Sequence, residues 1–261
     1  MYFMDGVARV KIGISGFDEL VEGGVPEGAN VLLTGTPGTA KTIFGIQYLC
    51  NGAAMGEPGV YVSLDESRDN LEKQAKAFGY DLERFEKEGT IAIVDIPLDM
   101  AGVNIFESID AGVKKINAKR LVFDSLVTFA VNIDQFIVPL GYRLSDVDAS
   151  YKNTSMDRRV PYEGKSERRI TYLLINELGK LGTTNIVITA APQAGDHLTV
   201  DGVSEFACDG VIEFFNLLVG ANRARTMAVL KMRDTNHSQY IHDFELGEKG
   251  IVVKPAERVY K

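Results

Sequence analysis

Cysteine is scarce in this sequence: the 261 residues include only Cys50 and Cys208, and both stand among apolar residues. A disulfide framework or a structural zinc site needs more cysteines at closer spacing, so we predict two reduced thiols inside a core. Long apolar runs are also missing, since no stretch approaches the ~18 residues that a membrane-spanning helix needs. The first ten residues include an acid and lack an apolar segment long enough for export. We therefore expect a cytoplasmic protein that does not enter the membrane.

Basic side chains are outnumbered by acidic ones, 28 Lys and Arg against 36 Asp and Glu, which gives a formal net charge of −8. This balance excludes a protein whose whole surface binds nucleic acid, because such surfaces need an excess of positive charge. A local basic patch stays compatible with it. The length suits one large α/β domain, with or without a modest insertion, and is sufficient to bury a single core.

Glycine and small residues gather in the stretch GTPGTAKT, residues 35–42. Residues 31–34, before it, are apolar and predict a buried strand, and residues 43–55, after it, have the pattern of a helix. A strand, a glycine-rich loop ending in Lys-Thr and a helix are together typical of a phosphate-binding loop. The alternative is a glycine-rich turn that carries Lys-Thr by chance, and the two flanking elements make it the weaker interpretation.

The residue types in this loop suit a bound phosphate group. Backbone N–H groups can converge on an anion only where side chains leave room, which Gly35 and Gly38 allow. Lys41 would reach the β- and γ-phosphates of a nucleotide, and the Thr42 hydroxyl would hold the Mg²⁺ that bridges them. Ala40 replaces the last glycine of the G-x-x-x-x-G-K-[ST] pattern, and we expect it to be tolerated because alanine suits the helix that begins there. The predicted nucleotide-binding residues of the loop are Thr36, Pro37, Gly38, Thr39, Ala40, Lys41 and Thr42.

Strand-like and helical patterns alternate over most of the chain. After Ser67, a good N-cap, Leu71, Ala75, Phe78 and Leu82 recur at helical spacing and predict a helix. The alternation predicts a parallel sheet with helices on both faces and a ligand site beyond the carboxyl ends of the strands. The other predicted strands are residues 60–64, 90–95, 120–124 and 185–190, and the other predicted helices are residues 103–118 and 170–181.

Two later regions depart from this alternation. From about Asn132 to Lys165 the sequence is polar, rich in turn residues and mixed in charge, which predicts an insertion. Beyond Pro192, strand-like runs separated by turn residues predict an antiparallel extension of the sheet. These runs are residues 211–219, 226–232, 240–246 and 251–254. We therefore predict one α/β domain over residues 1–261, with an insertion at about 132–165 and a mostly parallel central sheet flanked by helices.

Acidic residues follow two of the predicted strands. Asp124 ends an apolar run, from where its carboxylate could orient Mg²⁺ through the water shell of the ion. Asp65 and Glu66 follow another strand, and one of them could polarise the water that attacks the γ-phosphate. The alternatives are an ordinary turn acid at Asp124 and, for the pair, two acids that begin the next helix, where the helix dipole favours them.

The string KMRDTNH carries four functional side chains at alternate positions: Lys231, Arg233, Thr235 and His237. If the segment is extended, these side chains share one face. A lysine and an arginine aimed together suit the charge that develops on a transferring phosphoryl group. From the spacing alone, a solvated basic strand end with a lone histidine is an equal alternative.

Several separate motifs, in the order in which they occur, resemble the KaiC-like branch of the RecA-type ATPases. They are GFDELVEGGVPEGANVLLTGTPGTAKT, VYVSLDES, LVFDSL, GVSEFACDGVI, VLKMRDTNHS and FELGEKGIVV, and the similarity runs from about Gly13 to Val253. The resemblance implies a RecA-like P-loop fold and an ATPase that uses ATP and Mg²⁺. Members of this family assemble side by side, commonly in rings of six, with the nucleotide at the subunit boundary, so a homo-oligomer is expected, and a hexamer first of all.

The resemblance also implies roles for particular residues. Residues 35–42 would be the Walker A loop and Asp124 the Walker B acid. Asp65 and Glu66 would be the family's adjacent acidic pair, which is usually two glutamates, so hydrolysis would be slower or would rely on Glu66. In relatives, the motif at residues 231–237 reaches the nucleotide of the neighbouring subunit. Activity would then depend on assembly.

The leading hypothesis is a regulatory or signalling ATPase, and three other functions stay open. The first is an autokinase, with hydroxyls such as Thr154 or Ser155 as acceptors. The second is a non-catalytic ATP sensor that assembles and recruits a protein partner, which the departures at Ala40 and Asp65 suggest.

The third is a recombinase-like ATPase that contacts DNA. The predicted insertion falls where recombinases of the wider superfamily carry a DNA-contacting loop. Acidic neighbours at positions 157, 163 and 167 dilute the charge of this region, so nucleic acid is the less favoured partner. The basic residues concerned are Arg158, Arg159, Lys165, Arg168 and Arg169.

Overall fold

A nine-stranded sheet forms the centre of the computed structural model, which describes residues 6–96, 102–136, 165–192, 197–219 and 222–254. Its strands are β3 (Asn30–Gly35), β4 (Gly59–Ser63), β5 (Ile91–Asp95), β6 (Arg120–Asp124), β7 (Thr184–Ile188), β8 (Gly210–Val219), β9 (Asn222–Met232), β10 (His242–Gly247) and β11 (Gly250–Val253). Their order is β11-β10-β9-β8-β3-β7-β6-β4-β5. From β8 to β5 all neighbours are parallel, and β9, β10 and β11 join in antiparallel pairs.

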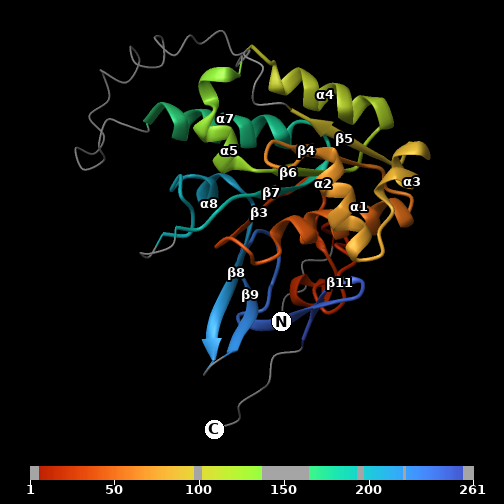
Figure 1. The fold of residues 1–261 in the computed structure, drawn as a ribbon. Helices are drawn as coiled ribbons and strands as arrows, with labels where there is room; N and C mark the ends of the chain where they lie inside the picture. Colours follow the sequence, from red (N-terminus) through yellow and green to blue (C-terminus); the bar gives the residue numbers. More distant parts are fainter. Residues whose placement is uncertain (1–5, 97–101, 137–164, 193–196, 220–221, 255–261) are drawn as a thin grey trace.

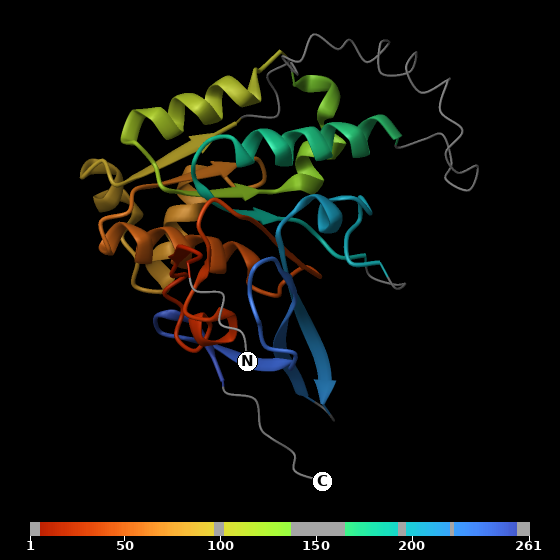
Figure 2. The same cartoon turned by 180° about the vertical axis from the view of Figure 1, so that it is seen from behind.

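Helices cover both faces of this sheet. The helices are α1 (Lys41–Ala54), α2 (Arg68–Ala77), α3 (Leu82–Lys87), α4 (Ile105–Ile116), α5 (Leu126–Val131), α7 (Lys165–Gly179) and α8 (Ser204–Ala207). Figures 1 and 2 show α1, α2 and α3 along one face and α4, α5 and α7 along the other. Each face has its own core, as the alternation of strands and helices predicts. The remaining short elements are β1 (Arg9–Val10), η1 (Asp18–Val21), β2 (Val25–Pro26) and η2 (Ile133–Gln135).

The predicted fold class is confirmed, with one correction to the antiparallel extension. The run at 211–219 was expected to be its first strand, but β8 pairs in parallel with β3 over Gly210–Phe214 and in antiparallel register with β9. The first half of β8 is buried between these two neighbours, so it belongs to the parallel sheet. The second half continues with β9 as a long hairpin that extends beyond the helical layers (Figure 1).

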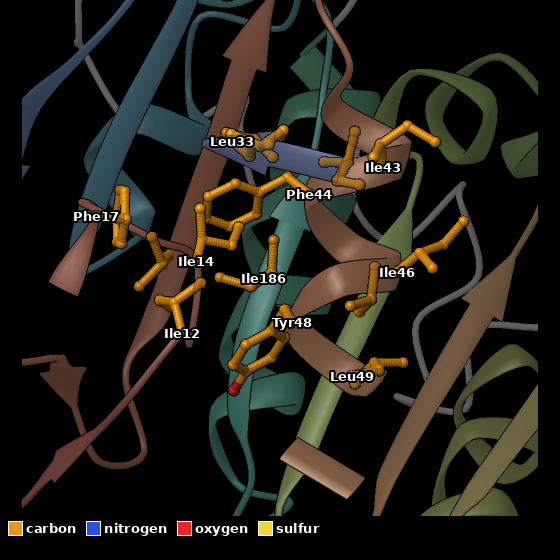
Figure 3. Close-up of a cluster of buried hydrophobic side chains, with 14 of the residues drawn as sticks. Ile12, Ile14, Phe17, Leu33, Ile43, Phe44, Ile46, Tyr48, Leu49 and Ile186 are labelled. Carbon is orange, nitrogen blue, oxygen red and sulfur yellow. The ribbon is translucent and has the colours of Figure 1, made fainter. Parts of the chain in front are cut away.

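Helix α1 is packed on nearly all sides. Its residues Phe44, Ile46 and Tyr48 are at most 1% exposed and project from different sides of the helix into the same core (Figure 3). The segment before β3 packs against α1. The Phe17 and Phe44 rings meet there edge-on, with their centroids 5.4 Å apart. Burying one such side chain stabilises the fold by about 1.5–3 kcal/mol. The helix that follows the phosphate loop is therefore held rigidly at its first residue, Lys41.

A buried arginine reinforces the far end of α1. The Arg120 side chain is fully buried at the start of β6, where it donates hydrogen bonds of 2.7 and 2.5 Å to Glu57 and one of 2.8 Å to the carbonyl oxygen of Tyr48. Its guanidinium also lies 4.6 Å from the centre of the Tyr48 ring. A methyl group on Gly52 would stand 2.3 Å from this side chain, which explains a glycine inside the helix. The sequence pattern did not predict this contact.

The helix predicted after Ser67 is in fact two helices. Ser67 caps α2, which ends at Ala77, because Gly79 follows with a φ of 76° that no continuing helix allows. Asp81 then caps α3 by accepting a hydrogen bond from Arg84 N at 3.0 Å. Leu71, Ala75 and Leu82 still share one buried cluster, so the helical spacing of apolar residues survives the break.

The predicted insertion lies mostly outside the described residues. The structure follows the chain through η2 to Phe136 and again from the start of α7 at Lys165. Thr154, Ser155, Arg158 and Arg159 are therefore not placed. The other boundaries differ from the predicted ones by a few residues, since β9 begins at Asn222 and β10 at His242.

Candidate nucleotide-binding site

A cavity of about 470 Å³ opens beyond the carboxyl ends of β3, β7, β6 and β4. This is the edge at which parallel sheets bind ligands. It gathers residues from separate parts of the chain: the loop before α1, the Asp65–Glu66 pair, Asp124 and the segment that follows it. Of the predicted site residues, it is lined by Pro37, Gly38, Thr39, Ala40, Lys41, Thr42, Asp65, Glu66 and Asp124. Thr36 contributes its carbonyl oxygen to the loop, which accepts a hydrogen bond of 2.8 Å from Thr39.

Ala40 does not behave as the sequence suggested. It is not the first helical residue but the N-cap of α1, with a φ of 74° and a ψ of 27° in the left-handed region. A non-glycine residue there costs roughly 1–2 kcal/mol because its Cβ approaches the following carbonyl oxygen. The position demands the conformation of glycine, as Gly38 with its φ of 79° also shows. The expectation that alanine is tolerated here without cost is therefore wrong, because Ala40 has a strained backbone conformation.

Lys41 points back over the loop that precedes it. Its Nζ donates hydrogen bonds to the carbonyl oxygens of Gly35 at 2.7 Å and Thr36 at 3.0 Å. Burial lowers the pKa of Lys41 below its usual value, and the nearby carboxylate of Asp124 opposes that shift. Among the described residues, the hydrogen-bond partners of this partly buried ammonium are neutral carbonyl oxygens, so the lysine is suited to an anionic ligand such as a phosphate.

Asp124 joins three elements at the floor of the cavity. Its Oδ2 accepts hydrogen bonds from Thr42 Oγ1 at 2.9 Å and from the Tyr61 hydroxyl at 2.7 Å. Burial raises the pKa of Asp124 to about 6, and the two hydrogen bonds work against that rise. Tyr61 is a contact that sequence reasoning missed; its only signal is a phenol in an otherwise aliphatic strand.

The two adjacent acids have different environments. The Asp65 carboxylate accepts hydrogen bonds from Ser125 Oγ at 2.8 Å and from Thr128 Oγ1. Burial raises the pKa of Asp65, while the bond from Ser125 acts in the opposite direction. The carboxylate of Glu66 makes no hydrogen bond or ion pair with a described residue. Both acids precede the Ser67 cap, so the alternative in which they begin the helix is wrong.

One further polar group faces the cavity from the end of β7. Thr189 is 1% exposed, lines the cavity, and its Oγ1 has no partner among the described residues. Sequence reasoning missed Thr189, as well as Ser125, Thr128 and Gln74, which also line the cavity. No local signal marks these four, because only the strand order places them beside the loop.

The motif at residues 231–237 lies at the opposite end of the strands from the cavity. Because β9 is antiparallel, its last residue, Met232, pairs with Gly210, whose other neighbour is Val31 at the start of β3. The phosphate loop follows the other end of β3. None of Lys231, Arg233, Thr235 and His237 lines the cavity of its own chain.

The condition for these four side chains to share one face is not met, because the segment is not extended beyond Met232. The strand ends at Met232, and the chain turns through Asp234, whose φ is 52°. Lys231 stays in the strand and donates to the carbonyl oxygens of Glu205 at 3.2 Å and Cys208 at 2.6 Å. Arg233 lies in the turn and forms an ion pair of 2.7 Å with Asp209.

The described part of the chain lacks two features that would point to other functions. No group of three or more His, Cys, Asp or Glu side chains is arranged to hold a metal ion there. Within the same ranges, no helix has the length and apolar character needed to cross a membrane. Cys50 and Cys208 are buried and free, as predicted.

A family model described as "ATPase: KaiC" matches residues 10–138 and 130–258. The chain belongs to the KaiC ATPase family. It is 33% identical to a UPF0273 protein of Thermotoga maritima over 96% of this chain and 98% of that protein. It is 30% identical to the circadian clock oscillator protein KaiC of Synechococcus elongatus over 95% of this chain but only 44% of that protein.

A solved structure supports the same assignment. A KaiC-like protein from Pyrococcus horikoshii OT3 shares 40% sequence identity with this chain, and the two superpose with a TM-score of 0.77 over 96% of this chain and 100% of that one. The resemblance to KaiC-like ATPases and the RecA-like fold inferred from the motifs are thereby confirmed.

The strain at Ala40 of this KaiC-family loop can be measured. We expect Ala40→Gly to raise the free energy of unfolding by about 1 kcal/mol, since glycine adopts a positive φ without the steric cost. Ala53→Gly, in the last turns of the same helix, should lower it by about 1 kcal/mol. Urea unfolding followed by circular dichroism measures both values. A loss of stability in both variants would contradict the strain at Ala40.

The raised pKa of Asp124 predicts a pH dependence of stability. The folded chain holds the Asp124 proton up to about pH 6, whereas the unfolded chain releases it near pH 4. Ionisation therefore costs the folded state, and the contribution of Asp124 to stability falls as pH rises from about 4 to 6 and then levels off. In EDTA, the unfolding free energy of the wild type relative to Asp124→Asn should fall by on the order of 2 kcal/mol across this window. A constant difference between the two proteins would contradict the assignment.

Proposed function

We propose that this KaiC-family protein is a Mg²⁺-dependent ATPase that acts as an oligomeric regulatory or signalling switch, with each nucleotide bound at a subunit boundary. One observation carries the proposal: Lys41, the hydrogen-bonded Thr42–Asp124 pair and the acids Asp65 and Glu66 converge on a single cavity. Each group supplies one part of phosphoryl transfer to water.

The residues present fit ATP and Mg²⁺. The loop offers backbone N–H groups ahead of a helix N-terminus, and Lys41 has only carbonyl partners to give up for phosphate oxygens. Thr42 and Asp124 would hold Mg²⁺, because their oxygens lie 2.9 Å apart and are the hard ligands that this ion prefers. When bound, the ion supplies neutralisation of the charge that builds on the phosphate oxygens.

Glu66 is the better candidate for the general base. Two hydroxyl donors already occupy the carboxylate of Asp65, which therefore acts as a brace between the end of β4 and the start of α5. Glu66 keeps its carboxylate unengaged by described residues at the rim of the same cavity. It would take a proton from the attacking water, and Asp65 would hold the backbone that presents it.

The placement of the 231–237 motif supports a boundary-spanning role. It lies at the amino ends of the parallel strands, so it cannot reach the phosphate loop of its own chain. Arg233, 57% exposed, is accessible to a neighbouring copy. Side-by-side assembly, in a ring of six as in relatives, would bring this edge to the next subunit's cavity and complete the site there. Lys231, Arg233, Thr235 and His237 would then contact the neighbour's nucleotide.

No described residue favours the autokinase or the DNA-binding alternative. The suggested acceptors Thr154 and Ser155 lie outside the described residues, and of the basic residues only Arg168 and Arg169 have placed side chains. The non-catalytic sensor uses the same site and differs from the ATPase only in turnover.

The Lys41→Ala variant tests the proposed function. We expect it to bind ATP at least tenfold more weakly and to lose measurable turnover, because the charge that meets the phosphates is gone. Lys114→Ala, which removes an exposed lysine paired with Asp110 on α4, is the control and should behave as the wild type. Phosphate release and fluorescent-ATP binding give the two readouts. Equal turnover in both variants would refute the site, and tight binding without turnover in the wild type would identify a sensor.

A second pair of variants separates the roles of the two acids. Glu66→Gln should lower kcat by about 10²–10⁴-fold with ATP affinity nearly unchanged, as expected for loss of a general base. Asp65→Asn should lower kcat less, by about tenfold, because asparagine still accepts hydrogen bonds from Ser125 and Thr128. The reverse order of effects would assign the base to Asp65. Single-turnover hydrolysis at saturating ATP makes the comparison independent of binding.

A further inference from the structure

A partly buried guanidinium ties the start of the chain to the 231–237 motif. The Arg9 side chain is 16% exposed in β1. Within the lead-in to β3 it donates hydrogen bonds to the carbonyl oxygens of Val21 at 3.4 Å and Gly24 at 3.1 Å, and it forms an ion pair of 2.8 Å with Glu22. Three acceptors from one short segment hold the planar fork in a single orientation.

The same two terminal nitrogens also reach the turn after β9, and Nη1 shares its two N–H groups among three acceptors. Arg9 donates to Thr235 Oγ1 at 2.9 Å and to the carbonyl oxygen of Asp234 at 2.9 Å, across more than 220 residues of sequence. Glu22 Oε2, besides pairing with Arg9, accepts a hydrogen bond from Asn236 N at 3.2 Å. We call Arg9 and Glu22 the clamp. The clamp contacts three consecutive residues of the motif and none of the phosphate cavity.

The backbone has an unfavourable conformation at Glu22 of the clamp and at Asp234, which the clamp contacts. Glu22 has a φ of 56° and Asp234 a φ of 52°, both in the left-handed region and neither a glycine. Such residues persist where the surroundings over-determine them, and they concentrate at functional sites. Ser238 N, donating to the carbonyl oxygen of Leu20 at 2.8 Å, fastens the far side of the turn. In both views the red lead-in lies beside the blue C-terminal strands (Figures 1 and 2).

We propose that Arg9 and Glu22 are positioning residues that fix the turn of the 231–237 motif for action on the neighbouring subunit's nucleotide. The inference rests on the proposed boundary-spanning role of that motif. Beyond Met232 the strand ends, and the Arg233 side chain of the Arg233–Asp209 ion pair is 57% exposed, so the less exposed Arg9 side chain supplies the main anchor of the turn. A displacement of about 1 Å in a group that stabilises a transition state can cost 10²-fold in rate.

The first measurement compares single variants. Arg9→Ala should lower kcat by about tenfold to a hundredfold, while ATP affinity, to which the phosphate loop at the other end of the strands contributes most, should change much less. Arg9→Lys keeps the positive charge but not the planar guanidinium, so its kcat should lie between those of Arg9→Ala and the wild type. Lys11→Ala, an exposed position two residues further along, is the matched control and should keep wild-type turnover. Full activity in Arg9→Ala would overturn the proposal. If Arg9→Ala does not fold or assemble, Glu22→Gln is measured in its place, with the same expected loss of kcat.

Mixed oligomers then show on which side of the boundary the clamp acts. Lys41→Ala mixed with Arg233→Ala should partly regain turnover, because some boundaries combine an intact loop with an intact motif. Arg9→Ala should likewise recover when mixed with Lys41→Ala but not when mixed with Arg233→Ala, because its defect lies on the motif side. The opposite pattern, recovery with Arg233→Ala and none with Lys41→Ala, would overturn the clamp. No recovery in verified Lys41→Ala and Arg233→Ala mixtures would instead overturn the boundary-spanning role itself.

Discussion

The hydrogen bond from Thr42 to Asp124 is the contact on which the site depends. It joins the first turn of α1 to the end of β6 across the intervening strand β7, and the Tyr61 hydroxyl adds β4 to the same oxygen. A charged acceptor makes these bonds stronger than neutral ones, and burial keeps water from competing for them. The loop, the acid and the neighbouring strand ends are thereby held in one arrangement.

The core keeps that arrangement stiff. Helix α1 is wedged between the sheet and the lead-in by Phe17 and Phe44, and its other end is locked by the buried Arg120. This support also explains how the loop retains Ala40 in a glycine-like conformation, since the flanking strand and helix leave it no alternative. The strain lies in the loop to which the proposed function assigns the phosphates.

The phosphate-loop residues and the 231–237 motif lie at opposite ends of the strands. The phosphate cavity lies at the carboxyl ends of the parallel strands, while Arg233 and its neighbours lie at the amino ends. In the proposed assembly, a single chain would therefore contribute to two different sites. The clamp formed by Arg9 and Glu22 would set the geometry of its contribution to one of them. Regulation of such a protein can act on contacts between subunits as well as on nucleotide binding.

The sequence by itself determined the features that depend on neighbours along the chain. The strand–loop–helix around Lys41, the alternation of elements and the acids at strand ends follow from local composition and periodicity, so the fold class and most cavity residues were predictable. The tertiary structure alone decided the rest: the left-handed Ala40, the engagement of Asp65 by Ser125, and the turn that follows β9 after Met232. These depend on strand order and on contacts between residues about 60 to more than 200 positions apart. Local patterns carry no information about such contacts, because the same apolar strand can take any place in a sheet.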